Sequence, residues 1–306
     1  MKHVIMSLVA MMLPAVGAQA QVKIAAEGQE YVINSVSDAT SDAGTVSYEW
    51  YRNGELIPAC TTATCTVPAN LCYGHNVEFK RKAVTTDCMS EEQWAPTTIV
   101  VTFKCGDGHG TVVGGLCWAD RNVGEPGAFF TTVAISPGVY AGGYFYKWNS
   151  NKPWPYGNTA VADWPQGNQD VSMTWTVRPN PCPTGWRLPT AAEFQALIAT
   201  GSNWISSVGN NGFSAKGVTF GPNANNCSYG QLYDCVYFPA DGFRDIGSGD
   251  NYVLSYMGCY WSSNTTVYPN GGVADICGHA LQFYVTNEFY IECREKGNAC
   301  TIRCVQ

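Results

Sequence analysis

The sequence predicts a chain of two domains, a small all-β domain followed by a larger domain built around one helix and long irregular loops. Three observations carry this prediction. Short strand-like segments separated by turns fill residues 22–104, and a capped amphipathic helix begins near residue 190. Residues 137–180 are rich in Gly, Pro, Asn, Trp and Tyr with weak periodicity, which is typical of long irregular structure.

The first twenty residues have the pattern of a secretory signal peptide. Lys2 supplies a positive charge, residues 4–16 are apolar but too short to span a bilayer, and residues 18–20 read Ala-Gln-Ala, the form of a cleavage site. We therefore predict an exported protein, passing through the periplasm to the cell surface or medium, without a membrane span. No cysteine follows the apolar run, so we expect no lipid anchor there.

The charge of the chain is low and slightly acidic. Only 13% of the residues are charged, the formal net charge is −7, and no basic run occurs. Proteins that bind nucleic acid or anionic membranes through electrostatics carry clustered positive charge instead. The composition therefore disfavours both kinds of partner.

The fourteen cysteines all follow the signal segment, and in an exported chain their even number favours disulfides. Zinc is disfavoured because the sequence contains no C-x-x-C pair and only three histidines remain after processing. Sequence alone leaves the connectivity open. Short-range candidates are Cys60–Cys65, Cys72–Cys88, Cys105–Cys117, Cys227–Cys235 and Cys293–Cys300.

Residues 21–104 are expected to form the all-β domain. Segment 46–52 alternates and is followed by Asn53-Gly54, a strong hairpin signal, and 77–81 and 98–103 are further strands. The turn spacing is that of a β-sandwich. The Tyr-x-Trp-Tyr-x-Asn-Gly run at 48–54 resembles bacterial immunoglobulin-like modules, which implies a spacer or docking domain without chemistry of its own.

The clearest helix follows the segment Cys-Pro-Thr-Gly-Trp-Arg-Leu-Pro-Thr at 182–190. Thr190 is a candidate N-cap, and Glu193 completes a capping box. Phe194, Leu197 and Ile198 then place apolar side chains on one helical face. Gly201 follows where a helix C-cap is expected, and the segment contains no nucleophile or phosphate-binding pattern. We therefore expect a scaffold on which other segments pack.

Five short runs in the second domain together resemble the Fibrobacter succinogenes major paralogous domain (FISUMP), common in secreted and surface proteins of Bacteroidetes. They are W-A-D-R-N-V-G at 118–124, C-P-T-G-W-R-L-P-T at 182–190, F-P-A-D-G-F-R at 238–244, Y-W-S-S at 260–263 and I-R-C-V at 302–305. The family is similar in fold to C-type lectins and to formylglycine-generating enzymes. The resemblance implies that 105–306 is an α+β C-type-lectin-like domain with two helices, a small antiparallel sheet, a large loop region and a Cys182–Cys304 disulfide.

Most residues of these runs are expected to be structural. Trp186, Trp261, Arg187 and Arg303 are core or buried-network candidates rather than ligand contacts. A buried arginine needs a charged partner. Glu193 and Asp120 are both available, and the sequence does not choose between them.

The sequence does not favour calcium, another cofactor or catalysis. Glu125-Pro126-Gly127 and Trp148-Asn149-Ser150 are the nearest strings to lectin calcium motifs, and neither supplies a full set of oxygen ligands. Asp241, Asp245 and Asp250 are expected to be solvated loop acids rather than ion ligands. Catalysis of the formylglycine type needs a free reactive cysteine, and paired cysteines exclude one. His75, His109 and His279 are scattered, so we expect no catalytic residues and no metal.

The stretch 248–291 is the candidate ligand-binding face, with an ordinary polar loop as the alternative. Tyrosine and asparagine give adaptable contact surface at low entropic cost, as in antibody paratopes. The candidate ligand-binding residues are Asn251, Tyr252, Asn264, Tyr268, Asn270, Asp275, His279, Asn287 and Tyr290.

The leading hypothesis is an exported, non-enzymatic surface binding protein, of the adhesin or appendage-tip type. It would present the second domain to a protein or glycan ligand on another cell or host surface, with pilus or surface-assembly subunits as further partners. The resemblance adds that the protein is a diversity-generating retroelement target, which requires a nearby reverse transcriptase gene and a near-copy of the coding region for 250–300. The alternatives are a structural subunit of a cell-surface or fibre assembly, and an enzyme of the formylglycine-generating fold.

Overall fold

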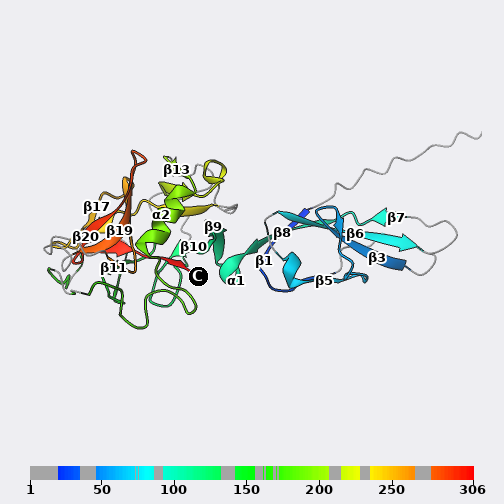
Figure 1. Ribbon diagram of the computed structural model, residues 1–306, viewed down its shortest axis with the longest axis horizontal. Coiled ribbons are helices and arrows are strands. Elements are labelled where there is room, and N and C mark those ends of the chain that lie inside the picture. The colour runs from blue at the N-terminus through cyan, green and yellow to red at the C-terminus, as the bar shows by residue number, and fades with distance from the viewer. Residues whose placement is uncertain are drawn as a thin grey trace, which may run out of the picture. The chain divides into compact units, whose positions relative to one another are not determined.

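A computed structural model describes residues 20–34, 46–72, 74, 76–85, 92–131, 142–155, 161, 163–167, 170, 172–206, 215–227, 235–265 and 277–306. The described part is mostly β-sheet, with one helix longer than a single turn (Figure 1). The chain divides into two compact units, unit 1 up to Phe103 and unit 2 from Lys104. The sequence analysis placed this boundary between residues 104 and 105. The predicted signal segment, except Ala20, lies outside the described residues.

Unit 1 contains a large sheet and a two-stranded sheet. The large sheet has the order β1-β8-β6-β3-β4, and β7 also pairs with β6. The small sheet pairs β2 with β5, and its residues join the large sheet around one apolar core. The strands of unit 1 are β1 (Ala20–Ala26), β2 (Tyr31–Ile33), β3 (Val46–Arg52), β4 (Glu55–Leu56), β5 (Cys65–Val67), β6 (Val77–Thr85), β7 (Glu92–Trp94) and β8 (Thr98–Lys104), with a 3₁₀ turn, η1 (Ala69–Leu71).

The hairpin predicted at Asn53-Gly54 is confirmed. Both residues have positive φ angles, 47° and 87°, and connect β3 directly to β4. Two successive positive φ values define the tight turn whose twist matches paired strands, and the Asn-Gly sequence favours it. The strands predicted at 77–81 and 98–103 correspond to β6 and β8.

The described residues of unit 2 form three sheets. The largest has the order β12-β11-β21-β18-β19-β20, with β16 and β17 attached at β21, and the two three-stranded sheets are β22-β10-β9 and β13-β14-β15. Its strands are β9 (Gly110–Val113), β10 (Leu116–Asn122), β11 (Phe145–Lys147), β12 (Pro153–Trp154), β13 (Ser202–Ile205), β14 (Gly217–Phe220), β15 (Val236–Pro239), β16 (Phe243–Arg244), β17 (Asn251–Tyr252), β18 (Met257–Trp261), β19 (Cys277–Tyr284), β20 (Phe289–Glu295), β21 (Ala299–Thr301) and β22 (Arg303–Val305). Its helical elements are α1 (Cys105–Gly108), α2 (Ala191–Ala199) and the 3₁₀ turn η3 (Ala224–Asn226).

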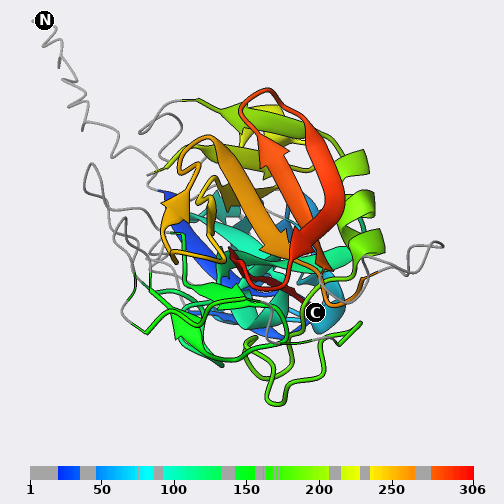
Figure 2. The ribbon, with the colours of Figure 1, turned by 90° about the vertical axis from the view of Figure 1, so that its left-hand side faces the viewer.

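The helix α2 begins as the sequence predicts; its C-cap is Thr200, and Gly201 follows with a positive φ of 109°. The Thr190 side chain accepts a hydrogen bond from the Glu193 main chain, and the Glu193 carboxylate accepts one from the Thr190 main chain, so the capping box is complete. Phe194 and Leu197 are buried, and α2 packs on β19 and β20 (Figure 2). The Glu193 carboxylate also receives two hydrogen bonds from Arg187, at 2.8 and 2.6 Å. Glu193, rather than Asp120, is therefore the partner of Arg187, but the Arg187 side chain is 48% exposed, so the expectation that it is a buried-network residue is wrong.

Alternate residues of the largest sheet face two different apolar cores. Tyr260, Leu281 and Phe283 pack with α2 and the β13-β14-β15 sheet. Cys259 and Trp261 point to the opposite face, where the core contains several tryptophans from the irregular segments. Because strand side chains alternate between faces, this sheet separates the two larger apolar cores found among the described residues of unit 2.

Six disulfides join twelve of the thirteen described cysteines. Four pairs agree with the sequence analysis: Cys60–Cys65, Cys105–Cys117, Cys227–Cys235 and Cys182–Cys304. The expected Cys293–Cys300 pair is wrong, since Cys293 bonds Cys277 and Cys300 bonds Cys259. Pairing of β19 with β20 brings Cys277 near Cys293, while β21 runs beside β18 and brings Cys300 to Cys259.

Cys72 is buried and forms no disulfide with a described cysteine. Its predicted partner, Cys88, lies outside the described residues. Within the described ranges, no helix is both long and apolar enough to cross a membrane.

Candidate functional site

The structure distributes the predicted ligand-binding residues over several places in unit 2. Tyr252 and Tyr290 are exposed, by 49% and 38%. Asn264 accepts a hydrogen bond from the first residue of α2, Ala191, at 3.0 Å, so its amide stabilises the helix start. His279 is buried in β19, and burial lowers the pKa of its imidazole.

The remaining predicted ligand-binding residues lie in other environments. Asn287 has a positive φ of 62° in the turn between β19 and β20. The side-chain amide of Asn251 is buried and has no hydrogen-bond partner among the described residues. Tyr268, Asn270 and Asp275 lie outside the described residues. The six described residues thus do not form one cluster, but two of them, Tyr252 and Tyr290, belong to a chain of ring contacts.

We call this chain of contacts the aromatic row; it consists of Tyr252, Phe243, Arg294, Tyr284 and Tyr290. The rings of Tyr252 and Phe243 stack with centroids 6.0 Å apart. The guanidinium of Arg294 lies over the Phe243 ring, 4.2 Å from its centroid. Tyr284 interacts with Arg294 and contacts the Tyr290 ring at 6.0 Å. Four strands, β17, β16, β20 and β19, contribute these side chains.

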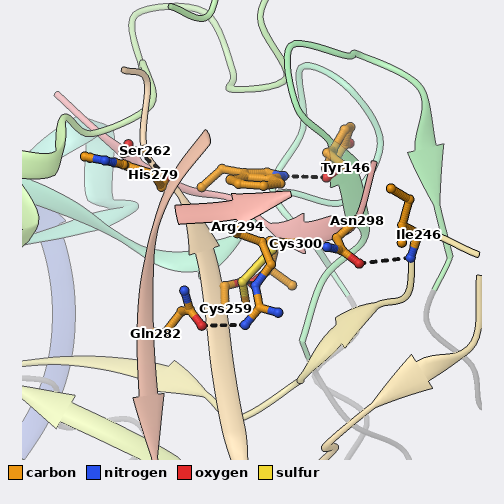
Figure 3. The surroundings of a disulfide bond; sticks show 11 residues. Tyr146, Ile246, Cys259, Ser262, His279, Gln282, Arg294, Asn298 and Cys300 are labelled. Carbon is orange, nitrogen blue, oxygen red and sulfur yellow. Dashed lines mark hydrogen bonds between the residues drawn. A yellow bond between two sulfur atoms is a disulfide. The ribbon is translucent and has the colours of Figure 1, made fainter. Parts of the chain in front are cut away.

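Strand alternation explains why the row lies on one face. In β20, Phe289 and Ile291 pack against the core that contains α2. Tyr290 and Arg294 therefore point to the other side, where Gln282 and Tyr284 of β19 also lie. Arg294 donates a hydrogen bond to Gln282 beside the Cys259–Cys300 disulfide (Figure 3).

Arg294 is the charged member of the row. Burial lowers the pKa of its guanidinium, and its contact with Tyr284 opposes that shift. Stacking over Phe243 is favourable because a cation is attracted to the negative face of an aromatic ring. The row thus combines flat apolar rings, hydroxyl groups and one oriented cation.

A short loop at residues 252–256, the display loop, begins at Tyr252 of the row and carries further exposed side chains. Val253 is 43% exposed and Tyr256 is 59% exposed. The main chain of Tyr256 accepts a hydrogen bond from the main chain of Val285 at 2.9 Å, and the Lys216 ammonium lies 5.5 Å from the centre of the Tyr256 ring.

The backbone of the display loop is strained and firmly held. Val253 has a φ of +53°, a conformation that costs a β-branched residue about 1–3 kcal/mol. Ser255 donates to Ala240 at 2.8 Å, and Gly242 donates to Met257 at 2.7 Å. Hydrogen bonds on both sides therefore keep the loop in one conformation. Strain of this kind is concentrated at functional sites, because the surrounding structure must stabilise it.

A buried polar cluster lies beneath the segment that holds this loop. Asp241, expected from the sequence to be a solvated loop acid, is instead 1% exposed, and its carboxylate has no hydrogen-bond partner among the described residues. Burial raises the pKa of Asp241 to about 7, although the charge of Arg303 opposes the shift. Arg303 is itself buried and donates to Asn122, at 2.7 Å, and to two main-chain oxygens.

The arrangement suits binding better than chemistry. Ser262 donates its hydroxyl to the main-chain oxygen of His279, not to the imidazole, so these residues do not form a nucleophile–base pair (Figure 3). Among the described cysteines only Cys72 is outside a disulfide, and burial raises the pKa of its thiol. A raised pKa makes a cysteine less reactive.

Metal binding has no support in the described ranges. They contain no group of three or more His, Cys, Asp or Glu residues placed to hold an ion. Asp245, one of the three aspartates considered from sequence, accepts hydrogen bonds from Gly247 and Ser248, at 2.8 and 3.1 Å. It therefore stabilises its own turn.

Sequence reasoning missed Phe243 and Arg294. Phe243 belongs to a run whose residues were expected to be structural, and Arg294 follows the candidate stretch 248–291, which does contain Tyr284. The available signal was alternation in 289–295, which sets Tyr290, Glu292 and Arg294 on one face. That signal does not reveal which strand lies beside them.

The site and fold together define a β-rich, disulfide-linked chain with an exposed aromatic surface on unit 2. No protein-family model matches the chain, and no curated protein matches it. Among solved structures, the chain matches SGBP-B of the Bacteroides ovatus mixed-linkage glucan utilization locus, determined in complex with a mixed-linkage heptasaccharide. The identity is 8%, the match covers 98% of this chain and 69% of that chain, and the TM-score is 0.23. A TM-score this low carries no argument about fold or function.

Proposed function

We propose that this is an exported, non-enzymatic binding protein whose second unit presents the aromatic row to a ligand on another cell or host surface. The ligand is a protein or a glycan. In this proposal unit 2 is a C-type-lectin-like domain of the FISUMP type, and unit 1 is an immunoglobulin-like module that connects it to the cell surface. The observation that carries the proposal is the aromatic row, together with a display loop whose main chain is held in one conformation by hydrogen bonds.

The composition of the row supports binding. Tyrosine and arginine are the residues that most often dominate binding energy, because they combine large contact area with polar groups. Tyr252 and Tyr290 are accessible, while Phe243 and Arg294 are half-buried between them. A ligand would therefore meet two exposed rings that are already oriented by their neighbours.

The rigidity of the display loop supports the same function. A loop that is ordered before binding loses less conformational entropy when the ligand arrives. Val253 is 43% exposed, and its main-chain oxygen accepts hydrogen bonds from the main chains of Tyr256 and Met257, both at 3.1 Å. The strained residue therefore closes the turn that would hold the loop ready for a ligand.

The test is capture of ligands by the full mature chain and by the Tyr252→Ala/Tyr290→Ala variant. The panel contains glycans, host matrix proteins and whole cells, with and without a chelator. We expect the double variant to lose at least about tenfold in affinity, since removing central aromatic contacts typically costs 1–2 kcal/mol or more. Because the row contains no metal ligands, capture should not change with chelator.

Val112→Ala is the matched control, since Val112 is 42% exposed on β9, outside the row. Both variants should keep melting temperatures close to that of the unmodified chain, because exposed substitutions usually change stability by less than about 0.5 kcal/mol. Unchanged capture by the double variant would remove the aromatic row as the site. Absence of capture across the panel, with the chain running as a large assembly, would favour the structural-subunit alternative.

A further inference from the structure

Unit 1 contains a groove of about 670 Å³ on the face of its large sheet that points away from the core. Trp50 and Phe79 point into the core, so the alternate residues of β3 and β6 point outward. The groove results from a bulge in the strand formed by β7 and β8. In the strand register, Lys82 of β6 lies opposite Trp94 of β7, and Phe79 of β6 lies opposite Ile99 of β8. Residues 80 and 81 of β6 therefore face four residues, 95 to 98, of the neighbouring strand.

Two aromatic rings form the main surface of the groove. Tyr51 of β3 and Trp94 of β7 lie with centroids 5.0 Å apart and planes inclined by 56°. Trp94 is 50% exposed, which is unusual because tryptophan side chains are highly buried on average. Pro96, from the bulge, and Gly54, from the hairpin turn, complete the apolar lining. A side chain on residue 54 would meet nothing within 4 Å, so the groove is open on that side.

The charged groups around the rings are paired with one another. Lys82 forms an ion pair with Glu49 at 3.4 Å, and Lys80, which lines the groove, pairs with Glu78 at 3.1 Å. Tyr51 donates its hydroxyl to Glu49 at 2.6 Å, which lowers the pKa of that carboxyl. The positive and negative charges around the groove therefore balance, and the Tyr51 hydroxyl already donates its proton to Glu49.

We infer that this groove binds a neutral saccharide. A pyranose presents a face of C–H groups that stacks on an aromatic ring, and a rim of hydroxyls that needs hydrogen-bond partners. Trp94 and Tyr51 supply the ring faces, and Lys80 and Thr98 supply polar groups at the lining. The volume lies within the roughly 300–1,000 Å³ typical of ligand sites.

The observations favour this ligand over two others. An acidic oligosaccharide needs an uncompensated positive charge, and both lysines beside the rings are paired with glutamates. A proline-rich peptide also packs on aromatic rings, but its carbonyls only accept hydrogen bonds, whereas saccharide hydroxyls both donate and accept and so also suit the paired Glu49 and Glu78 carboxylates near the rings.

The test titrates the full mature chain with neutral cello-, xylo- and manno-oligosaccharides, by calorimetry and by tryptophan fluorescence. We expect at least one of them to bind, and Trp94→Ala to weaken that binding at least tenfold. Trp94→Phe keeps an aromatic face and should retain affinity within a few fold. Val32→Ala, on the other sheet and 54% exposed, is the matched control and should bind normally.

Three results would overturn the inference. These are no binding of any neutral oligosaccharide at millimolar concentration, binding that Trp94→Ala leaves unchanged, and preferential binding of an acidic oligosaccharide or a proline-rich peptide. Binding here is independent of the aromatic row. The Tyr252→Ala/Tyr290→Ala variant should therefore keep it, so the aromatic row is judged only on ligands whose capture Trp94→Ala leaves unchanged.

Discussion

Replacing Asp241 by asparagine should make the protein more stable at neutral and alkaline pH, and the gain should disappear in acid. The folded protein raises the pKa of Asp241 to about 7 from an ordinary value of 3.8, because the ionised carboxylate is buried. Below the ordinary pKa, the carboxyl is protonated in both states. Between about pH 4 and pH 7 the unfolded chain ionises this carboxyl while the folded protein keeps the proton, so stability falls across that window and is constant above it.

The magnitude follows from the size of the shift. Each pKa unit corresponds to 1.36 kcal/mol, so a shift of this size corresponds to a penalty of about 4 kcal/mol above pH 7. Asparagine has nearly the same shape and does not titrate. The difference in unfolding free energy between Asp241→Asn and the unmodified protein should therefore increase by up to about 4 kcal/mol between pH 4 and pH 8.

The assay is thermal unfolding of both proteins, followed by calorimetry in steps from pH 4 to pH 8. For a unit of this size, about 4 kcal/mol corresponds to roughly 8–15 °C in melting temperature. Glu193→Gln is the control of opposite sign, because hydrogen bonds from Arg187 lower the pKa of Glu193. That variant should lose stability relative to the unmodified protein as pH rises, and by less, since the pair is partly exposed.

A difference between Asp241→Asn and the unmodified protein that stays constant from pH 4 to pH 8 would refute the reasoning. It would mean that Arg303 or another group compensates the buried carboxylate fully. A difference that decreases as pH rises would show that the ionised form of Asp241 is stabilised in the folded protein.

Two further predictions concern the frame of unit 2. Replacing Cys182 and Cys304 by serine opens a loop with a sequence separation of 122 residues and should cost about 5 kcal/mol in the chain-entropy model, measured as a lower denaturant midpoint; a midpoint equal to that of the unmodified protein would contradict it. Gly242 has a φ of +68°, and Gly242→Ala places a methyl group 1.9 Å from the main-chain oxygen of Tyr252, so the substitution should displace the display loop. It should reduce ligand capture as strongly as the Tyr252→Ala/Tyr290→Ala variant, although it removes no contact residue. Full capture by Gly242→Ala would show that the loop conformation does not matter.

The elements that the sequence predicted correctly are those formed by residues that lie close together in the chain. The capping box of α2 needs only Thr190 and Glu193, three residues apart, and the β3–β4 turn needs only Asn53-Gly54. Disulfides that close short loops, such as Cys60–Cys65, were predicted for the same reason. Local hydrogen bonds and backbone preferences are readable from adjacent residues because they form within one or two turns of chain.

The Cys182–Cys304 pairing came from a different source, the resemblance of the surrounding runs to a known family. The structure contains that disulfide. The resemblance itself remains a prediction, since no family model matches the chain.

The tertiary structure alone decided the sites. The aromatic row joins four strands whose order in the sheet is not their order in the chain, and the Cys259–Cys300 disulfide requires β18 and β21 to lie side by side. The unit 1 groove exists because the β7–β8 strand carries two more residues than its partner, which is visible only in the strand register. Composition placed tyrosines and asparagines in 248–291, but surface contacts between distant segments are fixed only when the sheets close and the two faces of each strand are assigned.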